Sequence, residues 1–285
     1  MKQKILDSFK KGYGILIALL VISVLTYILI FMSNNAVFFD VYDGLYYYNI
    51  KDTTTAMCKD YPSVEEIFYV NSQVKRLKNL QSLQLYIKSG DSLKFLKDFS
   101  ALEKLDLDAL GCSGTAALDT IPAMPDLKYI YLSFFEKDGL DFSPLRQFTA
   151  LEDFCTYDCN IHDWSFVEDL PKLRNIHYIS SQPKEDVNWM PLGSAESLEE
   201  FTASIIYYDR SLIDILEKLS SLNKVYLKFY GLEDLPEADR EYIYDWIGRM
   251  KEKGISVQVY NITPDISLQV VDITGISNYV KKGEN

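Results

Sequence analysis

The sequence predicts a solenoid of short parallel strands and helical returns, preceded by one transmembrane helix. Three observations support this α/β prediction. A pattern of three apolar positions recurs seven times at nearly constant intervals, and an uncharged apolar stretch occupies the N-terminal region. Of the 285 residues, 48% are hydrophobic and 25% are charged, which is typical of globular domains and excludes a disordered or collagen-like chain.

The apolar stretch defines a predicted membrane anchor at residues 12–33, within an uncharged region from Gly12 to Phe39. At about 1.5 Å per residue, an α-helix of this length extends about 33 Å, which is enough to cross a hydrocarbon core of about 30 Å. A cleaved signal peptide has a shorter apolar region and a small-x-small cleavage site, for which the segment from Asn34 to Ala36 is a poor candidate. We therefore expect an uncleaved signal anchor, with signal cleavage as the alternative.

The charges flanking this stretch predict its orientation. Four lysines lie within residues 1–11, and Asp40 and Asp43 follow the anchor. The positive-inside bias then places residues 1–11 in the cytoplasm and the rest of a single-pass plasma membrane protein outside it. The net charge of -12 argues against a nucleic-acid partner, because a protein that binds nucleic acid must neutralise phosphates.

The seven repeats each carry apolar or tolerant side chains at the first, fourth and sixth positions, and their first members are 22, 25, 24, 22, 25 and 24 residues apart. They are Leu80-Leu83-Leu85, Leu102-Leu105-Leu107, Leu127-Ile130-Leu132, Leu151-Phe154-Thr156, Leu173-Ile176-Tyr178, Leu198-Phe201-Ala203 and Leu222-Val225-Leu227. Alternation in the second half of each repeat predicts a short strand with its apolar side chains inward. A second apolar set, as in Phe142-Leu145-Phe148, predicts a helical or 3-10 return.

With this pattern, the chain resembles the leucine-rich repeat family, whose consensus is LxxLxLxxN/CxL. The return segments DFSPL (141–145), DWSFV (163–167) and NWMPL (188–192) are similar to those of the short-repeat bacterial class that includes the internalins. At the position where the family has Asn or Cys, only Cys159 fits, so we do not expect a regular side-chain ladder. The resemblance implies a membrane-tethered module that binds another protein.

The ends of a solenoid need caps, because they would otherwise expose apolar edges. We assign residues 34–63 to a juxtamembrane segment and N-terminal cap, and residues 64–260 to the repeat domain, with Val64-Ile67-Tyr69 as a short initial strand. Residues 236–253 predict a capping helix that Gly254 ends, and residues 255–260 a final strand. The tail, 261–285, has no assignment.

In this fold the strands line a concave face, and the variable positions between the apolar ones are free to bind a partner. The predicted partner-binding residues are Tyr86, Lys104, Asp106, Asp108, Tyr129, Tyr131, Asp153, Tyr157, His177, Glu200, Lys224, Tyr226 and Lys228. Five of these are tyrosines. Two interpretations stay open: tyrosine simply favours strands, or the tyrosines and aspartates form a recognition patch for a protein or peptide with basic or aromatic groups.

Enzymatic constellations lack partners in this sequence. Asp106, Asp108 and Asp153 are candidates for paired carboxylates, but acidic side chains on a strand are usually solvated, and calcium requires more oxygen ligands than these supply. Cys155 and His177 fall at equivalent positions of neighbouring repeats, without an orienting acid. We therefore predict a protein that is not an enzyme and that needs neither a cofactor nor a metal.

The four cysteines and one sequon add weaker expectations. We expect Cys112 and Cys159 to be buried thiols, and a Cys155–Cys159 bridge to be disfavoured by strand geometry. A Cys58–Cys112 pair is the alternative, and Asn261-Ile262-Thr263 is a glycosylation sequon.

Three classes of function therefore remain. The first is a membrane-anchored extracytoplasmic module that binds a protein or peptide through its concave face. The second is a structural subunit that docks through its span or its convex face. The third, more remote, is a protein that binds or hydrolyses surface glycans.

Overall fold

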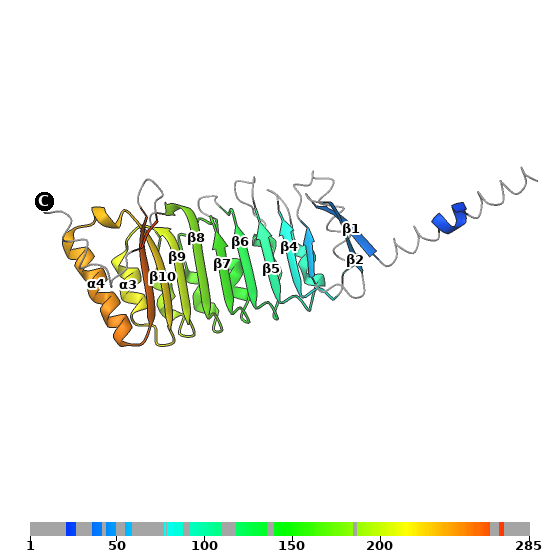
Figure 1. Cartoon of the computed structure of the whole chain (residues 1–285). Helices are drawn as coiled ribbons and strands as arrows, with labels where there is room; N and C mark the ends of the chain where they lie inside the picture. The colour runs from blue at the N-terminus through cyan, green and yellow to red at the C-terminus, as the bar shows by residue number, and fades with distance from the viewer. Residues whose placement is uncertain are drawn as a thin grey trace, which may run out of the picture.

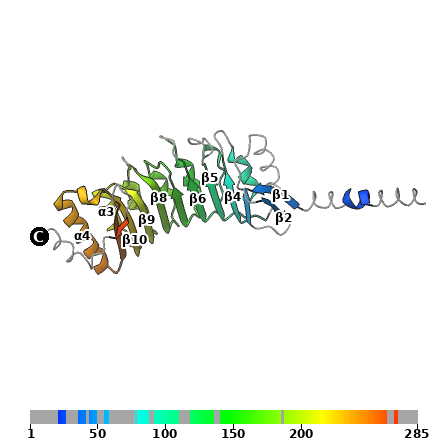
Figure 2. The same cartoon turned by 45° about the horizontal axis from the view of Figure 1, so that its top comes forward.

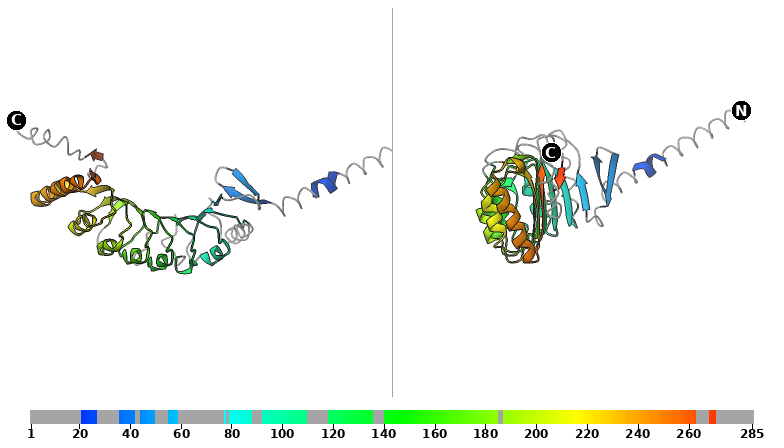
Figure 3. Two further views of the ribbon diagram at one scale, coloured as in Figure 1. Left: turned by 90° about the horizontal axis from the view of Figure 1, so that it is seen from below. Right: turned by 60° about the vertical axis from the view of Figure 1, so that its left-hand side comes forward.

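The computed structural model of the chain describes residues 21–26, 36–41, 44–49, 55–58, 77, 79–87, 92–109, 118–135, 140–184, 187–262 and 268–270. From residue 55 onwards they form a curved solenoid whose strands line the inner side of an arc and whose short helices line the outer side (Figure 3). Ten strands form one open sheet in which β3 to β11 are parallel and in sequential order. This is the architecture that the spacing of the repeats predicts.

The sheet follows the chain order (Figure 1). Its parallel strands are β3 (Thr55–Cys58), β4 (Ser82–Tyr86), β5 (Lys104–Asp108), β6 (Tyr129–Ser133), β7 (Asp153–Tyr157), β8 (Asn175–Lys184), β9 (Glu200–Ile206), β10 (Lys224–Tyr230) and β11 (Ser256–Ile262). The short β12 (Leu268–Val270) adds to β11 in the antiparallel direction. Each predicted repeat therefore supplies one strand, because its alternating half can bury one face while the other stays polar.

The returns on the outer side are 3-10 helices and one α-helix. They are η1 (Leu93–Asp98), η2 (Leu118–Thr120), η3 (Ser143–Gln147), η4 (Ser165–Asp169), η5 (Met190–Ser194), α3 (Arg210–Leu216) and η6 (Leu232–Asp234). Figure 2 shows that the returns stay on one side of the sheet along its whole length. The second apolar sets of the repeats thus fold as predicted.

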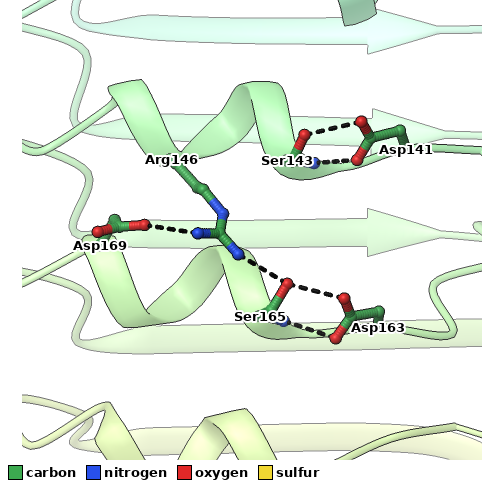
Figure 4. Close-up of polar contacts among 6 residues, drawn as sticks. All are labelled: Asp141, Ser143, Arg146, Asp163, Ser165 and Asp169. Carbon is green, nitrogen blue, oxygen red and sulfur yellow. Dashed lines mark hydrogen bonds and ion pairs between the residues drawn. The ribbon is translucent and has the colours of Figure 1, made fainter.

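An acidic side chain fixes the start of several returns (Figure 4). The Asp141 carboxylate accepts hydrogen bonds from Ser143 N at 2.8 Å and Ser143 Oγ at 2.7 Å, and Asp163 accepts the same pair from Ser165. These bonds satisfy amide groups that a helix start leaves without a partner. Arg146 then joins two neighbouring returns, donating to Asp169 at 3.2 Å and to Ser165 Oγ at 2.9 Å.

One continuous hydrophobic core extends from Leu77 to Val259 between the sheet and the returns. The inward positions of every repeat are buried, including Thr156 and Ala203, at which the pattern tolerates a side chain that is not strongly apolar. Near the centre of the core, the Trp164 ring stacks on Trp189 with a centroid distance of 5.5 Å. Because each coil covers the next, no repeat can bury its apolar face alone.

The C-terminal cap has the predicted form. The helix α4 (Glu237–Glu252) follows Pro236 and ends before Gly254, whose φ of +80° is the left-handed conformation that glycine adopts at low cost. Trp246, Ile247 and Met250 are buried on one face of the helix, as expected, whereas Tyr242 is only partly buried. Strand β11 then extends the sheet.

The N-terminal end differs in detail from the prediction. The strand that pairs with β4 is β3, which lies inside the segment assigned to the cap, and the expected strand Val64-Ile67-Tyr69 lies outside the described residues. Two further strands, β1 (Ala36–Val41) and β2 (Gly44–Asn49), form a separate antiparallel hairpin beside this end of the sheet.

Most of the predicted anchor, residues 12–33, lies outside the described residues. The part that is described, residues 21–26, is helical and exposed. None of the helices that the structure describes has the length and apolarity needed to cross a membrane.

Candidate binding face of the sheet

The register of the sheet brings the predicted binding residues into three straight rows across its concave face. We number the rows from the N-terminal ends of the strands. The first row contains Lys104, Tyr129, Asp153, Asn175, Glu200 and Lys224; the second contains Asp106, Tyr131, Cys155, His177, Thr202 and Tyr226; and the third contains Asp108, Ser133, Tyr157, Ile179, Ser204 and Lys228. Tyr86 pairs with Asp108 and so extends the third row through its backbone position.

Most side chains in these rows are only partly exposed. Neighbouring strands lie about 4.8 Å apart, so large side chains in one row cover one another. The expectation that every variable position is free to bind a partner is wrong for Ser133 and Ser204. Only 1% and 6% of their surface is exposed, because a serine is too short to rise between larger neighbours. The rows therefore combine protruding tyrosines with two recessed serines.

At the β5 end, a lysine contacts both an aromatic ring and a carboxylate. Lys104 Nζ lies 4.2 Å from the centre of the Tyr129 ring and 3.9 Å from Asp106 Oδ2. Burial raises the pKa of the Asp106 carboxyl, and the charge of Lys104 opposes this increase. Asp106 Oδ1 is buried and accepts no hydrogen bond from the described residues.

The two tyrosines of β6 stay neutral. Burial is the largest cause of the raised pKa of both phenols, and nearby groups add to it: the Cys155 thiol beside Tyr129, and Asp108 near Tyr131. Both hydroxyls therefore keep their protons, so that they act as uncharged hydrogen-bonding groups on large apolar rings.

At the β10 end, two lysines lie among aromatic and acidic side chains. Lys224 Nζ forms an ion pair with Glu200 Oε1 at 2.8 Å. Lys228 Nζ lies 5.3 Å from the centre of the Tyr226 ring, which also packs on Tyr260 with a centroid distance of 4.9 Å. Both lysines of β10 thus lie on the same face as the acidic side chains of β5.

The C-terminal ends of the strands carry apolar side chains that the sequence analysis did not select. Phe134, directly after β6, packs edge-on against Tyr157 with a ring-centroid distance of 5.4 Å. Tyr207, directly after β9, packs edge-on against Tyr230 with a ring-centroid distance of 5.8 Å. Ile179 in the third row is 37% exposed and Tyr207 is 39% exposed. Of these, the alternation of β8 and β10 in the sequence points to Ile179 and Tyr230, whereas Phe134 and Tyr207 lie beyond the repeat pattern.

The Cys155–His177 pair is adjacent in the sheet, as the repeat spacing predicts. Burial raises the pKa of the Cys155 thiol to about 11, which keeps the sulfur protonated at neutral pH. A nucleophilic cysteine needs the opposite change in pKa. Among the residues that the structure describes, no group of three or more His, Cys, Asp or Glu side chains has the geometry of a metal site.

Cys155 and Cys159 are both free thiols, so the disfavoured bridge between them is absent. Cys159 is buried, and its Sγ donates to Leu132 O at 3.3 Å, which is the role expected at the single Cys that fits the family consensus. Cys112 lies outside the described residues, and with it the proposed Cys58–Cys112 pair.

The sequon at Asn261 is not accessible in this fold. Asn261 is buried, its Oδ1 accepts a hydrogen bond from Leu232 N at 2.9 Å, and its Nδ2 donates to Glu233. Since glycosylation modifies that side-chain nitrogen, the folded chain does not present it.

The open parallel sheet, the 3-10 returns and the continuous core together fit a leucine-rich repeat solenoid. No protein-family model matches the chain, and no curated protein matches it at a significant level.

Solved structures provide three comparisons. An internalin (inlF) from Listeria monocytogenes strain 4b F2365 has 19% identity and a TM-score of 0.43, over 68% of this chain and 59% of that one. Internalin C2 (inlC2) from the same strain has 18% identity and a TM-score of 0.36, over 61% and 77% of the two chains. The PEPR1-AtPEP1 structure has 17% identity and a TM-score of 0.34, over 56% and 23%. The chain thus spans less than two thirds of the first internalin, and similarity at this level identifies no ligand.

Proposed function

We propose that this protein is a membrane-anchored, extracytoplasmic leucine-rich repeat protein that binds a protein or peptide partner through its concave face. The observation that carries the proposal is the alignment of Tyr129, Tyr131, Tyr157 and Tyr226 on one continuous face, among charged side chains, by the register of the sheet.

The physical argument for binding starts from the tyrosines. Each offers a rigid apolar ring and a neutral hydroxyl, a combination that is enriched at protein interfaces. The curvature of a solenoid makes the strand side an extended concave surface, which can contact a partner over several repeats. Four partly buried rings that already pack against neighbours lose little side-chain entropy when a partner covers them.

The support for the proposed location comes from the sequence. The uncharged stretch at 12–33 and the lysines before it support a single-pass anchor with residues 1–11 in the cytoplasm. Anchoring in this orientation places the rows of the concave face outside the cytoplasm, where they meet a partner at the surface or in the envelope.

A capture experiment tests the proposal. The full chain serves as bait for surface extract and culture medium, beside a Tyr129→Glu, Tyr131→Glu variant and a Met190→Glu, Tyr244→Glu control that adds two charges outside the concave face. Thermal melting checks that both variants remain folded. We expect the concave variant to lose the partner and the control to keep it.

The same experiment separates the alternative functions. Loss of the partner only in the control variant would place docking on the convex face or on α4, as a structural subunit requires. A partner that both variants retain equally would overturn binding through the rows. An extract whose glycan fraction alone binds would favour the glycan alternative.

A further inference from the structure

Two of the three rows of the concave face carry no Asp, Glu, Lys or Arg over four consecutive strands. From β6 to β9, the second row consists of Tyr131, Cys155, His177 and Thr202, and the third row of Ser133, Tyr157, Ile179 and Ser204. We call these eight residues the central floor. In a chain that is 25% charged, this strip differs from the first row beside it, which contains Asp153 and Glu200.

Two exposed apolar side chains lie in or beside the central floor, and a third, Met190, lies on the outer return η5. Outside residues 21–26, the large hydrophobic side chains of the described chain that remain most exposed are Ile179, Met190 and Tyr207. Ile179 belongs to the floor. Tyr207 directly follows β9, beyond the third row, and its ring contacts Tyr230. Solvent exposure of such groups costs free energy that an apolar partner would recover.

Charges of opposite sign bound the floor. On β5, Asp106 and Asp108 outnumber Lys104, and on the far side Lys224 and Lys228 outnumber Glu200. Lys224 is neutralised by its ion pair with Glu200, whereas Lys228 is placed over the Tyr226 ring. By formal charge, Lys104, Asp106 and Asp108 together carry -1, and Glu200, Lys224 and Lys228 together carry +1.

The dimensions of the floor suit one kind of ligand. From β5 to β10 there are five strand spacings of about 4.8 Å, or about 24 Å. An extended peptide advances about 3.3 Å per residue, so about seven residues cover this distance. The recessed Ser133 and Ser204 leave room beside Tyr157 and Ile179 for the side chains of such a segment.

Resting on the proposed function, we propose that the ligand is an extended peptide segment that crosses the strands, with apolar side chains on the central floor, a basic side chain at the β5 end and an acidic side chain at the β10 end. Charge complementarity fixes its direction, because the reversed segment would bring like charges together at both ends.

A displayed library of random nine-residue peptides, selected on the full chain, tests this inference. Selected peptides should carry apolar or aromatic residues between one basic and one acidic end. An Asp108→Lys variant, which makes both ends of the floor basic, should select peptides that are acidic at both ends and should bind the original peptides at least about tenfold more weakly. A Glu103→Lys, Lys128→Glu variant, which reverses a 3.0 Å ion pair outside the rows, should leave selection unchanged.

A second variant guards against misfolding of the first. Lys228→Met alone should remove the preference for an acidic residue in the selected peptides and keep the preference for a basic residue. Peptides without one basic and one acidic end, selection unchanged by Asp108→Lys, or no selected peptide at all would overturn the inference. The proposed function has its own readout, since capture of a folded protein partner that depends on Tyr129 and Tyr131 would survive each of these results.

Discussion

The ammonium group of Lys104 lies 4.2 Å from the centre of the Tyr129 ring on the neighbouring strand. The charge of the lysine therefore interacts both with this ring and with Asp106, whose carboxylate is 3.9 Å away. A cation over an exposed ring contributes about 0.5–1 kcal/mol, which is of the same order as an exposed ion pair. Asp106 is left with an incompletely compensated charge on a side chain that is only 20% exposed.

This arrangement predicts a pH-dependent gain in stability for Asp106→Asn. Burial raises the pKa of Asp106 above its usual value of 3.8, so the folded state binds this proton more tightly than the unfolded state. The wild type therefore loses stability as the pH rises from that value through the folded pKa, and the variant does not. Urea unfolding between pH 3 and pH 7 should show the variant more stable at neutral pH.

The control for this prediction is Asp126→Asn, at an exposed position in the loop before β6. It should show no such change relative to the wild type across the same pH range. If Asp106→Asn is destabilising at neutral pH, then the charge of Asp106 is compensated by more than the contact with Lys104.

The continuous core predicts that one buried charge affects several repeats. Leu132 and Leu105 have no exposed surface, and Leu132→Asp or Leu105→Asp would place a carboxylate among apolar side chains without a partner. We expect a loss of more than about 3 kcal/mol in the free energy of unfolding, with loss of the cooperative melt. Circular dichroism during heating measures this. Ala123→Asp, at an exposed position, should melt like the wild type.

The Cys155 thiol should react slowly although it lies on the concave face. With a pKa of about 11, its thiolate fraction at pH 8 is roughly 100-fold below that of an ordinary cysteine, and alkylation by iodoacetamide should slow accordingly. Mass spectrometry of the Cys155 peptide, before and after unfolding in urea, gives both rates. Rapid alkylation in the folded protein would revive a nucleophilic role beside His177.

The capping helix should depend on one ion pair. Arg249 donates from Nε and Nη2 to the two carboxylate oxygens of Glu217, both at 2.8 Å, which joins α4 to the end of α3. This hydrogen bonding lowers the pKa of Glu217, so its contribution to stability is present above the usual value of 4.5 and is lost as the pH falls through the folded pKa.

Glu217→Gln should therefore cost about 0.5–1 kcal/mol at neutral pH, as expected for a partly exposed pair with good geometry. The difference from the wild type should disappear in acid, which urea unfolding at pH 7 and pH 3 measures. Glu252→Gln, at an exposed position of α4, is the matched control. Equal effects of the two substitutions would mean that the ion pair does not hold the cap.

Much of the fold was predictable because its signal is periodic. The spacing of the apolar positions predicts that Lys104, Tyr129 and Asp153 are neighbours across three strands, and the register confirms it. The predicted capping helix and the buried Cys159 also follow from local patterns. Such features depend on residues that recur in every coil.

The remaining features depend on contacts between particular side chains. The burial of Ser133 and Ser204 depends on the size of their neighbours, and the burial of Asn261 on hydrogen bonds with Leu232 and Glu233, which no spacing rule contains. The strand β3 lies in a segment without the repeat pattern, so only its pairing with β4 identifies it. The same holds for the aromatic pair of Tyr207 and Tyr230.

Hydroxyl-radical footprinting of the complex with the captured partner tests the central claim most directly. Tyr131, Tyr157 and Tyr226 on the concave face and Met190, which is 65% exposed on the return η5, are all side chains that these radicals oxidise. We predict that the partner reduces oxidation of the three tyrosines at least about threefold, since an interface core excludes water, and leaves oxidation of Met190 unchanged. Protection of Met190 with unchanged tyrosines would contradict binding through the concave face.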